Sequence, residues 1–534
     1  MTNPRNIDLQ FDCHAFLSGL VSRTFHEGTA PDSDQPAVET VLQQLAESYE
    51  VVNVGRLDNR ASLIDSGVSP RFLEVVARGI GSHSAVFKQW AGEKLGRQLV
   101  AGEISSRVVD ALVTLETEKK YALSPLTGTF ECTRDSLGPN WYLFADPAAG
   151  FIAGQMMEPA FETVETVWIV PGPRKILFIE AGLDSHAVLR CCAYLLVHLA
   201  AKFRALVAYL QSPDRNVVVY DWPCEHFGHY VWNVISAWGA FFELAPPASV
   251  KAIACTTPDK FFGKITDVFG LSPDQVSERR VGSVEQAYAM TFSESWLLAS
   301  IHARHISANT ATHVIQHARK RCDPTFMERL MTLQKQHWPI VLLSLRFDNR
   351  SWVDQIEGFT QIAASLRQDF PEVAFVIHGL SKGVAMGWST WWMSLEVEIK
   401  AAAELEQALG GPQHVANAVG LGIHESVVIA DLCDLYLAPV GSGMALYKWL
   451  TNKPGVAFSN RFCLDPTNPG RWAFTVFDQH RQDIIPANYI PLTAVTDVEA
   501  DCHGEPSRAN FTLDRSVLYA TLRDFIGTLP RRNG

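Results

Sequence analysis

The turn Gly441-Ser442-Gly443 is the stretch of this sequence best suited to chemistry. It follows an apolar run at 435–438 that is typical of a strand, and it precedes a run at 444–450 that is typical of a short helix. Glycines between a strand and a helix start let backbone N–H groups approach an anion closely. In an α/β domain that anion is usually a diphosphate, so the turn predicts a phosphate site. An ordinary tight turn is the structural alternative.

Two arginines follow another predicted strand, at 340–345. Arg346 comes directly after that strand, and Arg350 lies in the same loop beside Ser351, a suitable N-cap. A guanidinium stays charged and matches the geometry of a phosphate. We therefore expect Arg346, with Arg350, to bind the same anion as the glycine turn, and Lys448 or Lys453 to add positive charge. Surface salt bridges are the alternative role for both arginines.

Two histidines, His226 and His229, flank Phe227-Gly228 shortly after a predicted strand at 216–220. An imidazole titrates near neutral pH, so it can take a proton from an attacking hydroxyl. We predict that His229 positions or deprotonates the acceptor of a transferred group, with His226 as the second candidate. The alternative is that one or both histidines cap the following helix or pack in the core.

A weaker motif, Gly420-Leu421-Gly422, precedes His424 and Glu425. It lacks the third glycine of a dinucleotide fingerprint, so NAD is not predicted. We expect His424 and Glu425 to contact a ribose or base, or else simply to begin a helix.

The sequence has no Walker-type phosphate loop and no His-Glu-x-x-His motif, and the spacing of Asp431 and Asp434 does not suit a metal pair, so no metal is predicted.

Strand-like and helix-like runs alternate from Lys175 onward and restart after Trp338-Pro339, which predicts parallel sheets covered on both faces. The first series of strands includes runs at 176–179, 216–220 and 250–254. The predicted fold class is α/β, with two doubly wound, Rossmann-like lobes whose ligands lie beyond the carboxyl ends of the strands. The predicted domains are a helical N-terminal region at 1–125, a β-rich connector at 126–170, lobes at 171–330 and 331–480, and a C-terminal extension with a helix at 481–534.

Composition narrows the class of protein. The chain has 534 residues, 47% hydrophobic and 19% charged, as expected for a globular protein of several domains. Its net charge of −12 disfavours nucleic acid or an anionic membrane as the main partner. Ten scattered cysteines without a Cys-x-x-Cys pair suit reduced thiols. With no apolar signal core or membrane span, we expect a cytoplasmic protein whose membrane association, if any, is peripheral.

Taken together, these residues resemble bilobed GT-B glycosyltransferases, in particular glycosyltransferase family 61. That family carries a His-Gly-Ala-Gly turn in its donor lobe, to which Val440-Gly441-Ser442-Gly443 is similar. Its acceptor lobe carries an Asn-x-x-His-Trp-like helix start, to which Phe227-Gly228-His229-Tyr230 is similar. Val440 stands in place of the family's histidine, and Tyr230 in place of its tryptophan. The resemblance covers residues 170–480 approximately.

The resemblance implies a hexosyl- or related transferase of bacterial glycan biosynthesis. Its donor would be a UDP- or GDP-linked sugar bound by 331–480, with no other cofactor. Its acceptor, bound by 171–330, would be a hydroxyl of a glycan, a lipid-linked saccharide or a protein. Self-association through the N-terminal helices is compatible with this assignment. Two alternatives stay open: a sugar-nucleotide epimerase-type enzyme, and a non-catalytic bilobed binding or scaffold protein.

Overall fold

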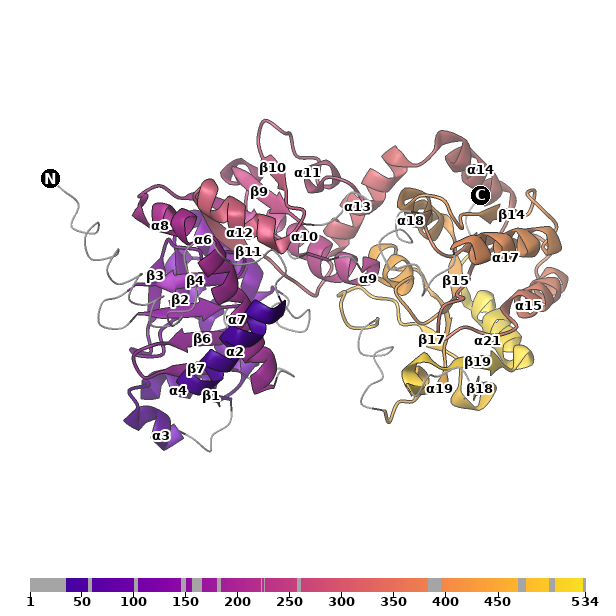
Figure 1. Cartoon of the computed structure of the whole chain (residues 1–534). Coiled ribbons are helices and arrows are strands. Elements are labelled where there is room, and N and C mark those ends of the chain that lie inside the picture. The colour runs from indigo at the N-terminus through magenta and orange to yellow at the C-terminus, as the bar shows by residue number, and fades with distance from the viewer. Residues whose placement is uncertain are drawn as a thin grey trace. The chain divides into compact units, whose positions relative to one another are not determined.

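The computed structural model describes residues 35–55, 60–99, 104–145, 150–155, 166–179, 184–221, 223–224, 226–256, 261–382, 395–468, 477–498 and 505–531. Residue contacts divide the chain into two compact units. Figure 1 shows the chain coloured by residue number. Unit 1 contains Met1–Pro223, Ala240–Thr256 and Ser272–Ala303; unit 2 contains Cys224–Gly239, Thr257–Leu271 and Arg304–Gly534. The predicted α/β class is confirmed, whereas the domain boundaries and the two-lobe arrangement stay predictions. Residues 1–34 of the predicted helical region lie outside the described residues.

The described residues of unit 1 include several helices, most of them within the region predicted to be helical. Their bounds are α2 Gln35–Ser48, α3 Arg60–Asp65, α4 Pro70–Val76, α5 Ile80–Leu95, α6 Ser106–Thr117, α7 Ser185–Ala201, α8 Phe203–Gln211 and α12 Val284–Ser293. Helix α10, Ser236–Leu244, runs from unit 2 into unit 1, and a 3₁₀ turn follows at Pro247–Ser249. No single helix in the described ranges is long and apolar enough to cross a bilayer, although α7 and α8, bent by 82°, pass that test together by length and composition alone.

The first sheet of unit 1 is mixed, with the strand order β1-β7-β6-β5-β4. Alternate side chains of β7 enter different clusters, as the period of two in a strand requires. Ile176 belongs to a core cluster with residues of α2 and α7, whereas Leu177 belongs to another with Phe72 of α4. Figure 1 shows α2 beside α7. The strands are β1 Glu50–Asn53, β4 Trp141–Phe144, β5 Phe151–Gly154, β6 Val167–Val170 and β7 Lys175–Phe178, and β2 Lys120–Leu123 forms a separate hairpin with β3 Phe130–Thr133.

The second sheet of unit 1 is parallel throughout, with the order β10-β9-β8-β11. The prediction that the run at 176–179 opens this sheet is wrong, because β7 instead pairs antiparallel with β6. A tight turn closes that hairpin: the N–H of Arg174, at a φ of 53°, donates to the carbonyl of Pro171 over 3.0 Å. So short a loop costs little entropy to close. The strands are β8 Asn216–Tyr220, β9 Ala252–Cys255, β10 Ser277–Arg280 and β11 Trp296–Ser300.

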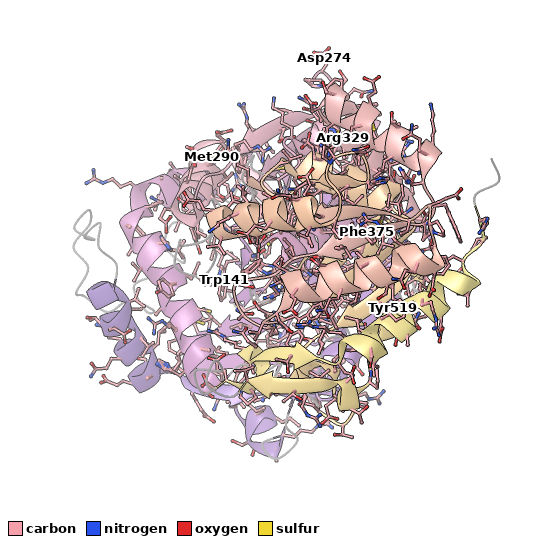
Figure 2. All side chains as sticks on the ribbon, turned by 90° about the vertical axis from the view of Figure 1, so that its right-hand side faces the viewer. Trp141, Asp274, Met290, Arg329, Phe375 and Tyr519 are labelled. Atoms are coloured by element: carbon pink, nitrogen blue, oxygen red, sulfur yellow. The ribbon has the colours of Figure 1, made fainter. Side chains whose placement is uncertain are left out.

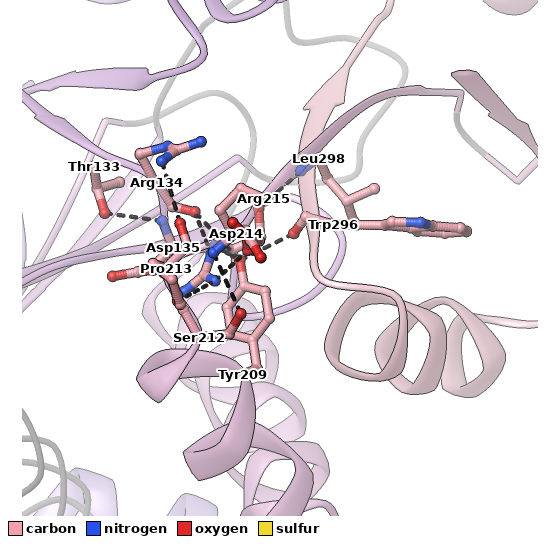
Figure 3. A network of polar contacts seen from close by, with 11 residues as sticks. Thr133, Arg134, Asp135, Tyr209, Ser212, Pro213, Asp214, Arg215, Trp296 and Leu298 are labelled. Atoms are coloured by element: carbon pink, nitrogen blue, oxygen red, sulfur yellow. Dashed lines mark hydrogen bonds and ion pairs between the residues drawn. The ribbon is translucent and has the colours of Figure 1, made fainter. Parts of the chain in front are cut away.

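A buried polar network joins the start of β8 to α8 and β11 (Figure 3). Arg215, whose side chain is 3% exposed, donates to the Asp135 carboxylate over 2.6 Å and to the carbonyl of Arg134 over 3.0 Å. Its guanidinium lies 3.9 Å from the ring centre of Tyr209, whose hydroxyl donates to the carbonyl of Trp296 over 3.0 Å. The buried charge is therefore both paired and hydrogen-bonded, as a stable interior requires.

Unit 2 is built on a parallel six-stranded sheet with the order β14-β13-β12-β15-β16-β17. Numbered along the chain, that order is 3-2-1-4-5-6, the doubly wound arrangement whose topological switch point lies between β12 and β15. Every residue of β12, β13 and β15 is buried, because helices cover both faces of such a sheet. The strands are β12 Ile340–Ser344, β13 Ala374–His378, β14 Val415–Asn417, β15 Leu435–Pro439, β16 Gly455–Phe458 and β17 Asn488–Tyr489.

The helices of unit 2 form two groups. Helix α15 packs against both α17 and α21, and Figure 2 shows the three lying over the sheet, with Tyr519 marking α21. Helix α18 packs against α13 and α14. The bounds are α9 Phe227–His229, α11 Ile265–Val268, α13 Ala308–Arg321, α14 Pro324–Gln336, α15 Gln355–Asp369, α17 Leu395–Ala408, α18 Ile423–Leu432, α19 Arg461–Leu464 and α21 Arg515–Thr528.

Short elements complete unit 2. Strands β18 Val495–Val498 and β19 Asn510–Leu513 form an antiparallel pair. The chain also makes π-helical turns at Tyr230–Ile235 and Ala445–Leu450, and 3₁₀ turns at Leu492–Ala494 and Pro506–Arg508. Three of these elements, the turns at Tyr230–Ile235, Ala445–Leu450 and Pro506–Arg508, carry residues that matter for the site.

Candidate functional site

A cavity of about 750 Å³ lies within unit 2, at the carboxyl ends of its parallel strands. Ser344, His378 and Pro439, the last residues of β12, β13 and β15, all line it. The cavity therefore opens at the topological switch point of the sheet, where α/β proteins of this topology bind ligands.

Arg346 and the glycine turn form one surface of this cavity. Gln355 fixes the backbone of Arg346 by accepting from its N–H over 3.1 Å and donating to its carbonyl over 2.7 Å. The guanidinium pairs with Asp348 over 2.9 Å and donates to the Asn349 side chain over 2.7 Å. Its Nη1 reaches the space that a Cβ on Gly441 would occupy, so the glycine makes room for the arginine.

Two further arginines, Arg350 and Arg508, line the same cavity. Arg350, at a φ of 53°, donates its N–H to the carbonyl of Arg508 over 3.2 Å, and Arg508 itself pairs with Glu505 over 2.7 Å. Burial, followed by the charge of Arg346, lowers the pKa of Arg350 to about 10. The charge of Arg346 disfavours the charged form of Arg350, so an anion bound beside both would stabilise them.

Sequence reasoning missed Arg508, which lies more than 150 residues after Arg346. A long-range bridge brings it there: Phe511 pairs with Trp352, and the Asn460 amide donates to the carbonyls of Pro506 and Ala509 over 3.1 and 3.0 Å. A lone arginine in a 3₁₀ turn carries no motif by which the sequence could identify it.

The two histidines also line this cavity, from the start of α9. His226 caps that helix, because its Nδ1 accepts from the N–H of His229 over 3.3 Å. Burial, followed by the charges of His229 and Arg346, lowers the pKa of His226 to about 4, so this imidazole is neutral at pH 7. A Cβ on Gly228 would lie 3.3 Å from the Cβ of Ser442, which brings the histidine segment directly against the glycine turn.

The surroundings of His229 favour one tautomer. Its Nδ1 lies 3.1 Å from Oδ1 of Asn233, an atom that can only accept, so Nδ1 carries the proton and Nε2 is left as an acceptor. The ring stacks on Trp232, with centroids 5.6 Å apart. His229 is therefore oriented as a base would need to be, whereas His226 uses its Nδ1 for the cap.

Three predicted site residues lie elsewhere. Lys448 is fully buried and pairs with Asp478 over 2.9 Å, so its charge is neutralised away from the cavity. The His424 ring lies 5.4 Å from that of His317 on α13, and Glu425 accepts from the N–H of Asp323 over 2.9 Å. The predicted residues that line the cavity are His226, His229, Arg346, Arg350, Gly441, Ser442 and Gly443.

Two buried cavity residues, Glu398 and His378, were not predicted. Burial is the main cause that raises the pKa of Glu398 to about 7, and burial lowers the pKa of His378 to about 4. Glu398 lies among the charges of a helix start, and His378 ends an apolar strand, so neither shows a motif. Within the described ranges no group of three or more His, Cys, Asp or Glu side chains is placed to hold a metal ion.

No protein-family model matches the chain, and a search of curated proteins finds no similar sequence. Among solved structures, the chain is similar to the E. coli heptosyltransferase WaaC with ADP-2-deoxy-2-fluoro heptose. That match has 10% sequence identity and a TM-score of 0.28, and it covers 52% of this chain and 94% of that chain. A score this low does not establish a shared fold.

Proposed function

We propose that unit 2 binds the diphosphate of a nucleotide sugar and that the protein is a glycosyltransferase. One observation carries the proposal: the guanidinium of Arg346 lies against Gly441 at the carboxyl ends of β12 and β15. A permanent cation beside a glycine turn, at the switch point of a doubly wound sheet, suits a diphosphate. Arg350 and Arg508 line the same cavity, where a bound diphosphate would compete with Asp348 and Glu505 for Arg346 and Arg508.

In the proposed reaction, the bond between the sugar's anomeric carbon and a diphosphate oxygen breaks, and a bond from an acceptor oxygen forms. The negative charge that develops on the departing diphosphate would be stabilised by Arg346, Arg350 and Arg508. Nε2 of His229 would accept the proton of the acceptor hydroxyl, while Asn233 holds the ring. Because the arginines supply the positive charge, we propose that the transfer needs no metal; the donor would be linked to UDP or GDP, and the acceptor would be a glycan, lipid-linked saccharide or protein.

Titration calorimetry with UDP, GDP and CMP, followed by incubation with the matching sugar nucleotides, tests this function. The proposal predicts binding of at least one diphosphate nucleotide and acceptor-dependent transfer of its sugar. Arg346→Ala is expected to weaken binding, whereas Arg523→Ala, a control on the exposed face of α21, is not. Absence of binding at millimolar concentration contradicts the proposal. Conversion of the sugar nucleotide without an acceptor favours an epimerase-type enzyme, and binding without any turnover favours a binding protein.

A further inference from the structure

Beyond the arginines, the cavity wall carries two buried polar side chains that the proposed transfer does not use. Glu398 and His378 both line the cavity, and each residue is only 4% exposed. The carboxylate lies directly beside Gly379, the residue that follows His378.

His378 is held by one ring nitrogen and leaves the other unused. Its Nδ1 lies 2.6 Å from the hydroxyl of Tyr447, which in turn lies 3.0 Å from the hydroxyl of Ser344. Its Nε2 is buried and has no hydrogen-bond partner in the described structure. Buried polar atoms are rarely left unpaired, and this one belongs to a residue of the cavity wall, so a small shift of the wall would let a ligand hydroxyl pair with it. Because burial keeps the pKa of the ring near 4, that partner meets a neutral imidazole at pH 7.

Glu398 offers a group that both donates and accepts. Its Oε2 accepts from the N–H of Leu380 over 2.6 Å. Its pKa of about 7 means that the protonated and ionised forms coexist at neutral pH. A phosphate would be repelled by the ionised form, so the anion belongs with Arg346. A neutral hydroxyl suits both Glu398 and His378, since it can donate to one group and accept from another.

We propose that Glu398 and His378 form a subsite for the hydroxyl groups of a sugar whose diphosphate is bound by Arg346 and the glycine turn. This inference rests on the proposed function, because the bound anion is what directs the sugar to this wall. It assigns to the cavity an anion-binding end and a neutral, polyol-binding end. A ligand that fills both is a sugar diphosphate rather than a free nucleotide.

A structural role for Glu398 is the competing explanation, since its carboxylate also holds the backbone of Leu380. The two roles differ in one readout, which is the ratio of the dissociation constant for UDP or GDP to that for the best-bound sugar of the same nucleotide. Loss of support for the loop would weaken nucleotide and sugar nucleotide alike and leave the ratio unchanged. Loss of a hydroxyl contact would lower the ratio.

The experiment measures that ratio by calorimetry with UDP, GDP, UDP-glucose, UDP-galactose, UDP-N-acetylglucosamine and GDP-mannose. Wild type is expected to bind one sugar nucleotide more tightly than its free nucleotide. Glu398→Gln, whose remaining amide nitrogen can only donate, and His378→Phe, which removes the ring nitrogens, are each expected to reduce the ratio about fivefold, the effect of one lost hydrogen bond. Glu404→Gln, on the exposed face of the same helix, is the matched control and should leave the ratio unchanged.

The outcomes separate this inference from the proposed function. A ratio that stays at the wild-type value in both variants, or a wild type that prefers no sugar nucleotide, overturns the subsite and leaves the diphosphate site standing. Absence of binding by every probe overturns both. If Glu398→Gln does not fold, as judged by thermal melting, the result for His378→Phe decides the question alone.

Discussion

Replacing Glu398 by glutamine should stabilise the protein, and the gain should depend on pH. Burial, the largest cause, raises the pKa of this carboxyl from an ordinary value of 4.5 to about 7. The folded protein therefore holds this proton more tightly than the unfolded chain does. The associated stability is fully present below pH 4.5 and is lost as the pH rises through 7. At about 1.4 kcal/mol per pKa unit, the loss amounts to roughly 3 kcal/mol at pH 8.

Glutamine does not ionise, and its side-chain oxygen can still accept the N–H of Leu380. The free energy of unfolding of Glu398→Gln should therefore exceed that of wild type by roughly 3 kcal/mol at pH 8, and by almost nothing near pH 4.5. Urea unfolding of both proteins at a series of pH values, followed by fluorescence and circular dichroism, measures the difference. Glu404→Gln, which removes an exposed carboxylate, should show no such trend. A difference that is independent of pH, or that grows toward acid, would refute the reasoning.

Three further changes test separate parts of the structure. Gly441→Ala should push the Arg346 guanidinium aside and weaken UDP binding roughly tenfold at nearly unchanged stability, and equal affinity in calorimetry would contradict this. Arg508→Ala should weaken UDP binding and reduce its dependence on salt; an unchanged salt dependence would remove Arg508 from the anion site. Arg215→Met should destabilise unit 1 by roughly 3 kcal/mol in urea unfolding, because it leaves the Asp135 carboxylate without its partner, while nucleotide affinity stays unchanged.

Local sequence patterns predicted the strands that carry the site more accurately than they predicted the site residues. The apolar runs at 340–345 and 435–438 form strands because a sheet covered on both faces needs continuous apolar residues. The rule that parallel strands share their carboxyl ends then explains why Arg346 and Gly441 meet. The order of the strands could not be predicted in this way, since it depends on pairing between residues that are distant in sequence.

The positions of the misplaced or missed residues depend on the exact helical period and on contacts between residues that are distant in sequence. Lys448 lies in a π-helical turn, which the 3.6-residue period of an α-helix does not anticipate, and its ammonium meets Asp478 instead of the cavity. Arg508 reaches the cavity through a segment anchored near the C-terminus. Glu398 and His378 are distinguished only by their burial, which composition and spacing do not reveal.

The central claim is that Arg346 and the glycine turn bind a diphosphate, and the most direct test compares UDP with uridine in wild type and Arg346→Ala. Titration calorimetry of the wild type should show far tighter binding of UDP than of uridine, because the proposed site places Arg346, Arg350 and Arg508 beside the diphosphate. Arg346→Ala should lower the ratio of the uridine to the UDP dissociation constant at least tenfold, on the order of one lost charge-assisted contact. The affinity for uridine should stay the same. A variant that retains the full preference for UDP would contradict the account.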